Sequence, residues 1–248
     1  MKPTNKFYTI ALLFIGLSCW QAEAQLNIPA HFAYVKGGTF IENSISLESH
    51  KNDSYYTKEI APFYMYRFET MVHTFEQFCE ETKMEMPPQP SWSNGLMPVV
   101  NVTYDQAVSF CNWLSKKYGM RFRLPTVEEW QYAAKAANFQ TEELIYNHPL
   151  PNQWVVYSKN ARNHSPSCIS CMQPNEIGLY AMCGNVWEWT QQQLKGFETS
   201  IVGGGYMDEA NNVKITSQKP FSMKNYQGDL GFRFVVAFDD FQAYLNKN

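Results

Sequence analysis

The sequence is poor in charge, and its basic residues are not clustered. Charged side chains make up 17% of the 248 residues, against roughly a quarter in typical soluble proteins. The net charge is −3, and the 20 lysines and arginines are scattered along the chain. Because binding to nucleic acid needs a basic face, we expect no nucleic acid among the partners.

Long hydrophobic runs are also missing after the first residues, so nothing later is expected to span a membrane. The start has Lys2 and Lys6, an apolar run over residues 10–17 and the small-x-small motif AEA at residues 22–24. This pattern predicts a signal peptide over residues 1–24. It therefore predicts an exported protein in the periplasm, at the outer membrane or outside the cell.

A second interpretation of the start concerns Cys19. Leu17-Ser18-Cys19 loosely resembles a lipoprotein box, in which Cys19 would carry lipid, although Gly16 and Trp20 fit that box poorly. Lipidation would turn a protein without an anchor into an anchored one. A membrane is thus expected as a partner only if Cys19 is lipidated.

Histidine is scarce, and the five histidines show no close spacing. A mononuclear iron site usually takes two histidines with a carboxylate, so only a distributed site of that kind stays open. Of the six cysteines, five remain if Cys19 is removed with the leader. That odd number predicts at least one unbridged thiol even in an oxidising compartment.

Two cysteines lie close together in a segment without periodicity, and the pattern around them is H-x3-C-x2-C, formed by His164, Cys168 and Cys171. The purely structural interpretation is a disulfide, within the pair or from one member to Cys183. A metal site would need a further ligand, for example Cys183 or His148. A redox pair is the third alternative.

Aromatic residues are abundant, at 16% of the chain within an apolar fraction of 45%. This composition favours a loop-rich fold held by aromatic packing. Large aromatic side chains usually serve as core residues. We therefore expect four tryptophans to be core residues: Trp113, Trp130, Trp187 and Trp189.

The early part of the chain predicts strands and one helix. Residues 32–40 and 60–68 are β-prone, and the polar residues 43–58 are expected to form a loop between them. Residues 73–82 predict a short helix. From about residue 147 to residue 175 the sequence is irregular, which is typical of a functional or pinned loop.

Two further helices have clear start signals. Residues 103–106 and residues 126–129 each form a capping box ahead of a periodic apolar run. Between them, Arg121 and Arg123 lie in a short extended link and are expected to tie loops by hydrogen bonds. No repeat or linker interrupts residues 25–248, so we predict a single mixed α+β domain.

Four segments, taken together, resemble the formylglycine-generating enzyme family, also called sulfatase-modifying-factor domains. The motifs RLPT-x-x-EW and GL-x-x-M-x-GNVWEW are highly specific in combination, and the match covers nearly the whole chain after the leader. The resemblance implies an α+β fold related to C-type lectins, with little regular secondary structure and a shallow groove. The four segments are residues 62–78, 97–135 and 175–189, and residues 202–207 with 231–234.

The resemblance also implies a chemistry that this chain has lost. Enzymes of the family bind copper(I) with two cysteines after a GGS motif and oxidise a substrate cysteine to formylglycine. That pattern falls on residues 203–208 and places Asp208 and Val213 at the two cysteine positions. A carboxylate is a hard ligand and an isopropyl group is none, so the pair is not suited to copper(I). After Gln173 the only cysteine is Cys183, so no shift in alignment restores the pair.

Calcium is a second feature that the resemblance implies. In relatives one calcium ion lies against the GNVWEW turn, and the matching positions here are Ala181, Gly184, Val186 and Glu188. Ala181 offers no side-chain oxygen, which should weaken a calcium site that prefers six to eight oxygens. No cofactor is firmly predicted, and calcium remains an open alternative.

The functional prediction follows from these losses. We expect a non-catalytic exported module whose groove around Tyr206, Asp208, Asn211 and Asn212 binds a protein or a glycan. Related domains without the cysteines occur in envelope lipoproteins of gliding motility and type IX secretion, and the resemblance suggests such a role. The alternative is a copper- or iron-dependent oxidoreductase with an atypical site.

Overall fold

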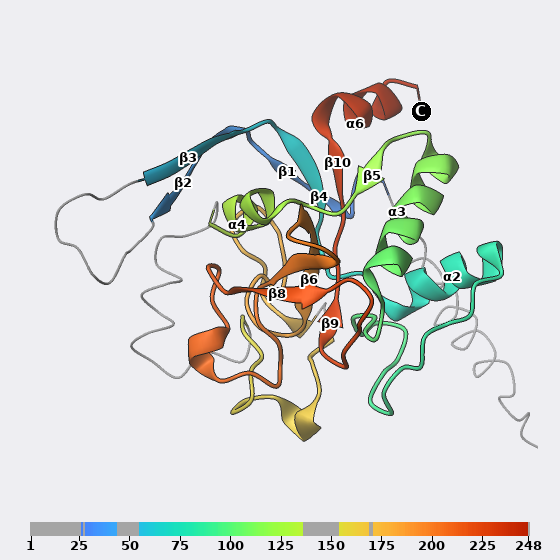
Figure 1. The fold of residues 1–248 in the computed structure, drawn as a ribbon. Helices are drawn as coiled ribbons and strands as arrows, with labels where there is room; N and C mark the ends of the chain where they lie inside the picture. Colours follow the sequence, from blue (N-terminus) through green and yellow to red (C-terminus); the bar gives the residue numbers. More distant parts are fainter. Residues whose placement is uncertain (1–25, 27, 44–54, 136–153, 169–170, 248) are drawn as a thin grey trace, which may run out of the picture.

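The computed structural model describes residues 26, 28–43, 55–135, 154–168 and 171–247 (Figure 1). The predicted leader with Cys19, and also His148, lie outside the described residues. Within the described part, no helix combines the length and the apolar character needed to cross a membrane. The elements are β1 (Phe32–Val35), β2 (Gly38–Asn43), β3 (Tyr55–Ile60), β4 (Phe63–Tyr66), α2 (Val72–Thr82), α3 (Tyr104–Tyr118), β5 (Phe122–Arg123), α4 (Val127–Lys135), η1 (Arg162–His164), β6 (Trp187–Gln193), β7 (Glu198–Val202), η3 (Ala210–Asn212), β8 (Gln218–Ser222), β9 (Leu230–Gly231), β10 (Val235–Ala237) and α6 (Phe238–Leu245).

Among the described residues, the strands form two four-stranded sheets and one separate pair. The first sheet has the order β1-β4-β10-β5 and is antiparallel throughout. The second has the order β8-β7-β6-β9, with β9 parallel to β6. Because β10 near the end of the chain lies between β4 and β5, the first sheet is complete only when the C-terminal segment returns to the N-terminal one.

The predicted strand runs over residues 32–40 and 60–68 are each divided in two. Pro62 separates β3 from β4, as expected for a residue that has no N–H for a ladder. The predicted polar loop over residues 43–58 is shorter than expected, because β2 and β3 extend into it from both sides. The antiparallel pairing of β2 and β3 extends to Asn43 and Tyr55. Backbone N–H and C=O groups that were expected to be hydrated in a loop are therefore paired between the strands.

The predicted helices are confirmed. At the start of α3, Gln106 N–H donates to Thr103 Oγ1 at 3.3 Å and Thr103 N–H donates to Gln106 Oε1 at 2.9 Å. The second capping box is also reciprocal, with Glu129 N–H donating to Thr126 Oγ1 and Thr126 N–H donating to Glu129 Oε2. In the described part of the irregular segment, the structure has the 3-10 turn η1 and a disulfide.

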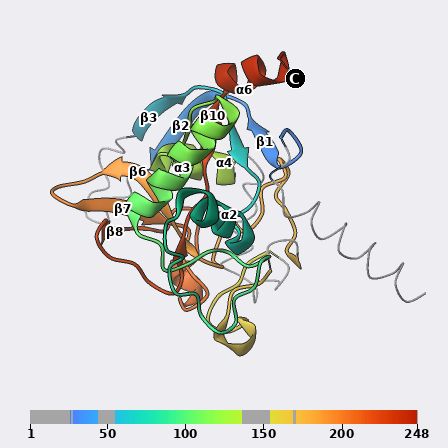
Figure 2. The same ribbon diagram turned by 90° about the vertical axis from the view of Figure 1, so that its right-hand side faces the viewer.

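Aromatic packing forms the core, as the composition predicts. Helices α2 and α3 lie side by side (Figure 2), and Phe75 of α2 stacks on Phe110 of α3 with ring centroids 5.7 Å apart. Phe232 meets both rings edge-on, and Phe234 packs against Phe110 from the same segment. The segment around β10 is thereby fixed against the two helices.

Three of the four tryptophans predicted for the core are buried, namely Trp130, Trp187 and Trp189. Trp113 is the exception, because it is only half-buried, although its ring packs against Phe78 and Phe110. Its indole N–H donates to Glu81 at 2.8 Å, and the Lys117 ammonium lies over its ring. It therefore covers the edge of the core.

Candidate functional site

A tight turn follows β7 and carries the first position at which the resemblance expects a catalytic cysteine. Gly203 and Gly204 both have positive φ, at 95° and 82°. A Cβ on Gly204 would lie 2.5 Å from the Asn212 carbonyl oxygen and 2.8 Å from Val213 Cα. Only glycine suits this position, because the turn packs directly against the segment that carries Val213.

Asp208 is used to hold this turn together. Its Oδ2 accepts a hydrogen bond from Trp187 Nε1 at 2.6 Å and another from Gly205 N–H at 2.8 Å. Its carbonyl oxygen accepts from Ser158 N–H at 2.9 Å. The carboxylate thus ties the turn to β6, and the carbonyl ties it to the segment before η1.

The second expected cysteine position is part of the core. Val213 has no exposed surface, and it lies in the same apolar cluster as Trp130. Asn211 and Asn212 before it form the short turn η3 and are exposed. Among the described residues, no group of three or more histidine, cysteine, aspartate or glutamate side chains is placed to hold a metal ion.

A second carboxylate and an ammonium group surround Trp187. Asp229 is 7% exposed and accepts from Gln227 Nε2 at 2.7 Å. Its Oδ2 is so close to Gly205 that a Cβ there would lie 2.6 Å from it. Burial, and then the charge of Asp208, raise the pKa of Asp229 above its usual value. Lys219 opposes this shift without cancelling it. The Lys219 ammonium lies 4.2 Å from the centre of the Trp187 ring, so the indole is held between opposite charges.

This arrangement accepts hydrogen bonds, but it is a poor ligand set for copper(I). Its donors are the carboxylates of Asp208 and Asp229, which are hard oxygen ligands, whereas copper(I) prefers thiolates. The nearby ammonium of Lys219 lowers the pKa of Asp229 and would repel a metal cation. The residues present therefore do not fit the copper chemistry of the enzymes that the chain resembles.

The predicted binding groove is only partly a surface feature. Asn211 and Asn212 are exposed and Asp208 is half-buried, but Tyr206 is buried and donates to the Gly228 carbonyl at 3.3 Å. Tyr206 therefore supports the site from below. The grouping of these residues as a binding groove stays a prediction.

Two exposed apolar residues beside this turn were not predicted from the sequence. Met207 and Tyr226 are each 56% exposed. A Cβ on Gly228 would lie 3.8 Å from the terminal methyl of Met207, so this side chain packs over the segment next to Tyr226. Met207 lies between two predicted groove residues, Tyr206 and Asp208, in the sequence. The sequence around Tyr226, by contrast, does not indicate that Tyr226 lies near Met207.

At the predicted calcium site of Gly184, Val186 and Glu188, the glutamate side chain is already paired within the protein. The Glu188 carboxylate is buried and accepts hydrogen bonds from Arg233 Nε and an Arg233 terminal nitrogen, both at 2.7 Å. It also accepts from Trp130 Nε1 at 2.7 Å. Because a guanidinium already neutralises this carboxylate, a calcium ion there would meet a fixed positive charge.

A second buried glutamate completes this network. Glu69 accepts hydrogen bonds from the Asn185 side chain and from Val186 N–H. Burial, and then the Glu188 carboxylate, raise its pKa to about 8, although Arg233 acts in the opposite direction. The GNVWEW turn is thus held from inside by two glutamate side chains and one guanidinium.

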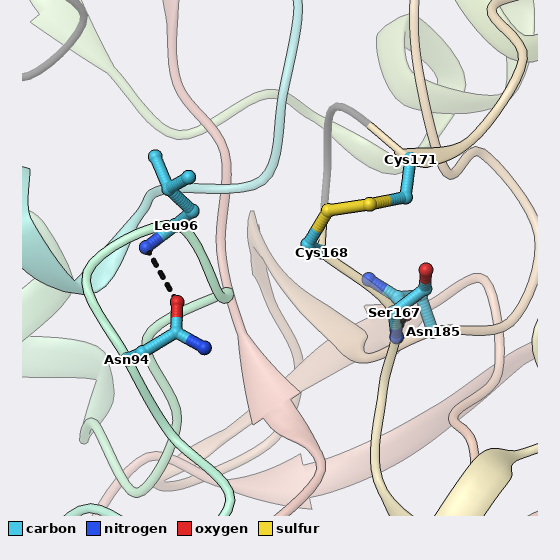
Figure 3. Close-up of a disulfide and its surroundings, with 6 residues drawn as sticks. All are labelled: Asn94, Leu96, Ser167, Cys168, Cys171 and Asn185. Carbon is cyan, nitrogen blue, oxygen red and sulfur yellow. Dashed lines mark hydrogen bonds between the residues drawn. A yellow bond between two sulfur atoms is a disulfide. The ribbon is translucent and has the colours of Figure 1, made fainter. Parts of the chain in front are cut away.

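The disulfide alternative for the CxxC pair is confirmed, and the bridge is within the pair. Cys168 and Cys171 are joined with their Cα atoms 5.3 Å apart (Figure 3). Ser167 N–H donates to Asn185 Oδ1 at 2.8 Å and thereby attaches this loop to the GNVWEW turn. The metal alternative loses its two thiolate ligands, and Cys183 keeps its thiol in the core.

The chain is similar to several known proteins. The model of the sulfatase-modifying factor enzyme 1-like domain matches residues 19–238. Inactive C-alpha-formylglycine-generating enzyme 2 of Bos taurus is 28% identical over 156 residues, which cover 55% of this chain and 49% of the relative. Chaperone protein LppX of Paenibacillus barcinonensis is 25% identical over 276 residues, which cover 89% of this chain and 94% of that protein.

The formylglycine-generating enzyme of Mus musculus is 30% identical over 105 residues, or 38% of this chain and 26% of the enzyme. The chain thus spans about half the length of the inactive relative and about a quarter of this enzyme, but nearly all of LppX.

Solved structures confirm the predicted α+β fold. PvdO from Pseudomonas aeruginosa superimposes with a TM-score of 0.69 at 16% identity, covering 84% of this chain and 94% of that one. CarF gives a TM-score of 0.67 at 24% identity, covering 86% of this chain and 100% of that one. At these identities the likeness concerns the fold alone.

Proposed function

This chain belongs to the family of sulfatase-modifying factor enzyme 1-like domains, and from that premise we propose that it is a non-catalytic member that binds a protein partner. One observation carries the proposal. The two positions at which the family's enzymes have copper-binding cysteines are both committed to structure, since Asp208 fixes Trp187 and Val213 lies in the core. The chain keeps the turn of the family but lacks both copper-binding cysteines. Such a domain is better suited to binding a partner than to copper-dependent oxidation.

The relatives support this direction. One matching protein is named an inactive member of the family, and another, aligned along nearly the whole chain, is named a chaperone. Both names describe those proteins. For this chain they favour a role in which the fold supports another protein.

The contact that we propose is the Met207–Tyr226 surface, which consists of Met207, Tyr226, Asn211 and Asn212. A flexible thioether and an exposed phenol can fill hollows on a partner, and the two amides add hydrogen bonds at the rim. Beneath them the turn is rigid because Asp208 is hydrogen-bonded on two sides. A rigid base lowers the entropy that binding costs.

We further propose that the module acts outside the cytoplasm. The leader-like residues 1–24 and the disulfide between Cys168 and Cys171 both favour an oxidising compartment. The mass of the mature N-terminus tests this. A chain that begins at Gln25 or at a lipid-modified Cys19 supports export, and an uncleaved Met1 contradicts it.

Site-specific photo-crosslinking tests the proposed surface. A benzoyl-phenylalanine at position 207 should yield one discrete cross-linked protein in native envelope material, and Tyr226→Ser should reduce its yield about tenfold. Ile41 is the matched control position, because it is 50% exposed and lies on β2, a strand of the separate pair. Equal yields from positions 207 and 41, or cross-links to glycan alone, would contradict a protein partner at this surface.

The catalytic alternative is tested independently. The purified chain is incubated with copper(I), oxygen and a sulfatase peptide that contains the substrate cysteine, and the peptide mass is followed. We expect no conversion of cysteine to formylglycine, because Asp208 and Val213 supply no thiolate. Turnover that depends on copper would overturn the non-catalytic proposal.

A further inference from the structure

A cavity of about 590 Å³ lies between α3, β5 and β6, and it shares no residue with the Met207–Tyr226 surface. Pockets for small molecules generally measure about 300–1,000 Å³, so this one has the size of a ligand site. Polar and apolar groups both contribute to its wall. Its lining includes Tyr104, Val108, Asn112, Arg121, Leu124 and Gln191.

The local structure explains why these side chains meet. Tyr104, Val108 and Asn112 are spaced by four residues, so they form one stripe along α3. In the extended segment at β5, Arg121 and Arg123 point to one side, and the Phe122 side chain between them is buried in the core. The helix stripe and the two arginines thereby form adjoining walls.

The two arginines have different roles. Arg123 donates to both oxygens of Glu129 at 2.7 Å and to the Leu124 carbonyl at 3.1 Å, so its charge is balanced and its position is fixed. Arg121 is exposed at the rim, and its backbone N–H donates to Asp240 Oδ2 at 3.3 Å. The prediction that both arginines tie loops thus holds for the Arg123 side chain, while the Arg121 guanidinium faces solvent.

The chemistry of the walls selects a ligand class. A guanidinium at the rim suits a carboxylate, with which it can form two parallel hydrogen bonds. Val108 and Leu124 contribute apolar surface to the wall, and the amides of Asn112 and Gln191 can donate and accept hydrogen bonds. These three kinds of contact suit a molecule that has an acid at one end, a polar linkage in the middle and an apolar body.

We propose that this cavity binds a small organic carboxylate with an amide or hydroxyl linkage and an apolar group. The carboxylate pairs with Arg121, the linkage contacts Asn112 and Gln191, and the apolar group lies against Val108 and Leu124. A free small molecule and the C-terminal residue of a peptide share this chemistry. The site is independent of the proposed protein partner, because it uses a different part of the fold.

Titration calorimetry and ligand-observed NMR with N-benzoylglycine test the proposal on the folded chain. The probe should bind in the range of about 1 mM or tighter, and its neutral amide should bind at least about tenfold more weakly. Arg121→Gln should weaken the acid about tenfold, and Arg121→Lys should restore part of the loss. Arg162→Gln removes an exposed arginine of η1 and should leave binding unchanged.

A benzoylated peptide with a free C-terminus distinguishes the sources of the carboxylate. Binding of that peptide and of N-benzoylglycine with similar affinity indicates a chain terminus, and binding of the small acid alone indicates a free molecule. The proposal is overturned if neither acid binds at about 10 mM, far above ordinary ligand affinities. It is also overturned if the neutral amide binds as well as the acid, or if Arg121→Gln and Arg162→Gln behave alike.

Discussion

Replacing Glu188 by glutamine separates a buried charge from its partner. The carboxylate accepts three hydrogen bonds of 2.7 Å, two from Arg233 and one from Trp130. A glutamine offers one oxygen, and its amide N–H groups face donors that already point at this position. Arg233 has no exposed surface, so water does not replace the lost acceptor.

The expected cost follows from this burial. Removing one member of a buried ion pair typically costs about 3–5 kcal/mol, because the remaining charge stays buried without compensation. Glu69 reduces the cost somewhat, since its carboxyl group interacts with the same guanidinium. We therefore expect Glu188→Gln to lower the free energy of unfolding by about 3 kcal/mol near neutral pH.

The same network gives a pH dependence. The pKa of Glu69 is raised from 4.5 to about 8 in the folded chain, so its protonated form stabilises the fold. That contribution is complete below pH 4.5, declines by at most about 1.4 kcal/mol per pH unit, and is lost above about pH 8. Glu188→Gln removes one cause of the shift, so the variant should lose less stability than the native chain as pH rises.

Urea unfolding followed by tryptophan fluorescence, at about pH 6 and about pH 8, measures both effects. Glu129→Gln is the matched control, because it breaks a bidentate pair with Arg123 that is only partly buried. Because a glutamine can still accept the capping bond from Thr126 N–H, that change should cost only about 1 kcal/mol or less. If Glu188→Gln costs no more than Glu129→Gln at an unchanged m-value, the reasoning is wrong.

Two further predictions concern the turn and the disulfide. Asp208→Ala should lower the free energy of unfolding by about 1–3 kcal/mol, because the buried Trp187 N–H loses its acceptor. Asp208→Asn, which keeps an oxygen there, should cost less in the same urea titration, and equal costs would exclude the hydrogen bond as the cause. Replacing Cys168 and Cys171 by serine opens only a short loop, so the loss should not exceed about 2 kcal/mol by thermal unfolding. A larger loss would mean that the bridge supports more than its own loop.

Much of the fold could be predicted from the sequence because its signals are local. The capping boxes at Thr103 and Thr126 act over three residues, and both are present as predicted. The boundaries of β2 and β3 were harder to predict, because each strand extends as far as it pairs with the other, up to Asn43 and Tyr55. Local propensity carries no information about such a partner.

The candidate site could be located from the sequence but not interpreted in full. The resemblance to the family motif, laid on residues 203–213, implies that Asp208 and Val213 are at the cysteine positions. What Asp208 does instead depends on Trp187, which lies 21 residues earlier in the chain. Tyr206 belongs to the same motif, yet only the packed structure shows that it is buried while Tyr226 is exposed.

The sequence by itself determined the family, the loss of the two thiolates and the start of each helix, because these depend on residue type and short spacing. Tertiary structure alone decided the partners of the buried charges. Glu188 pairs with Arg233 across 45 residues, and Asn185 pairs with Glu69 across 116. At the position where the resemblance implies calcium, the Glu188 carboxylate is paired with Arg233, since a buried carboxylate is stabilised by whichever cation the fold brings to it.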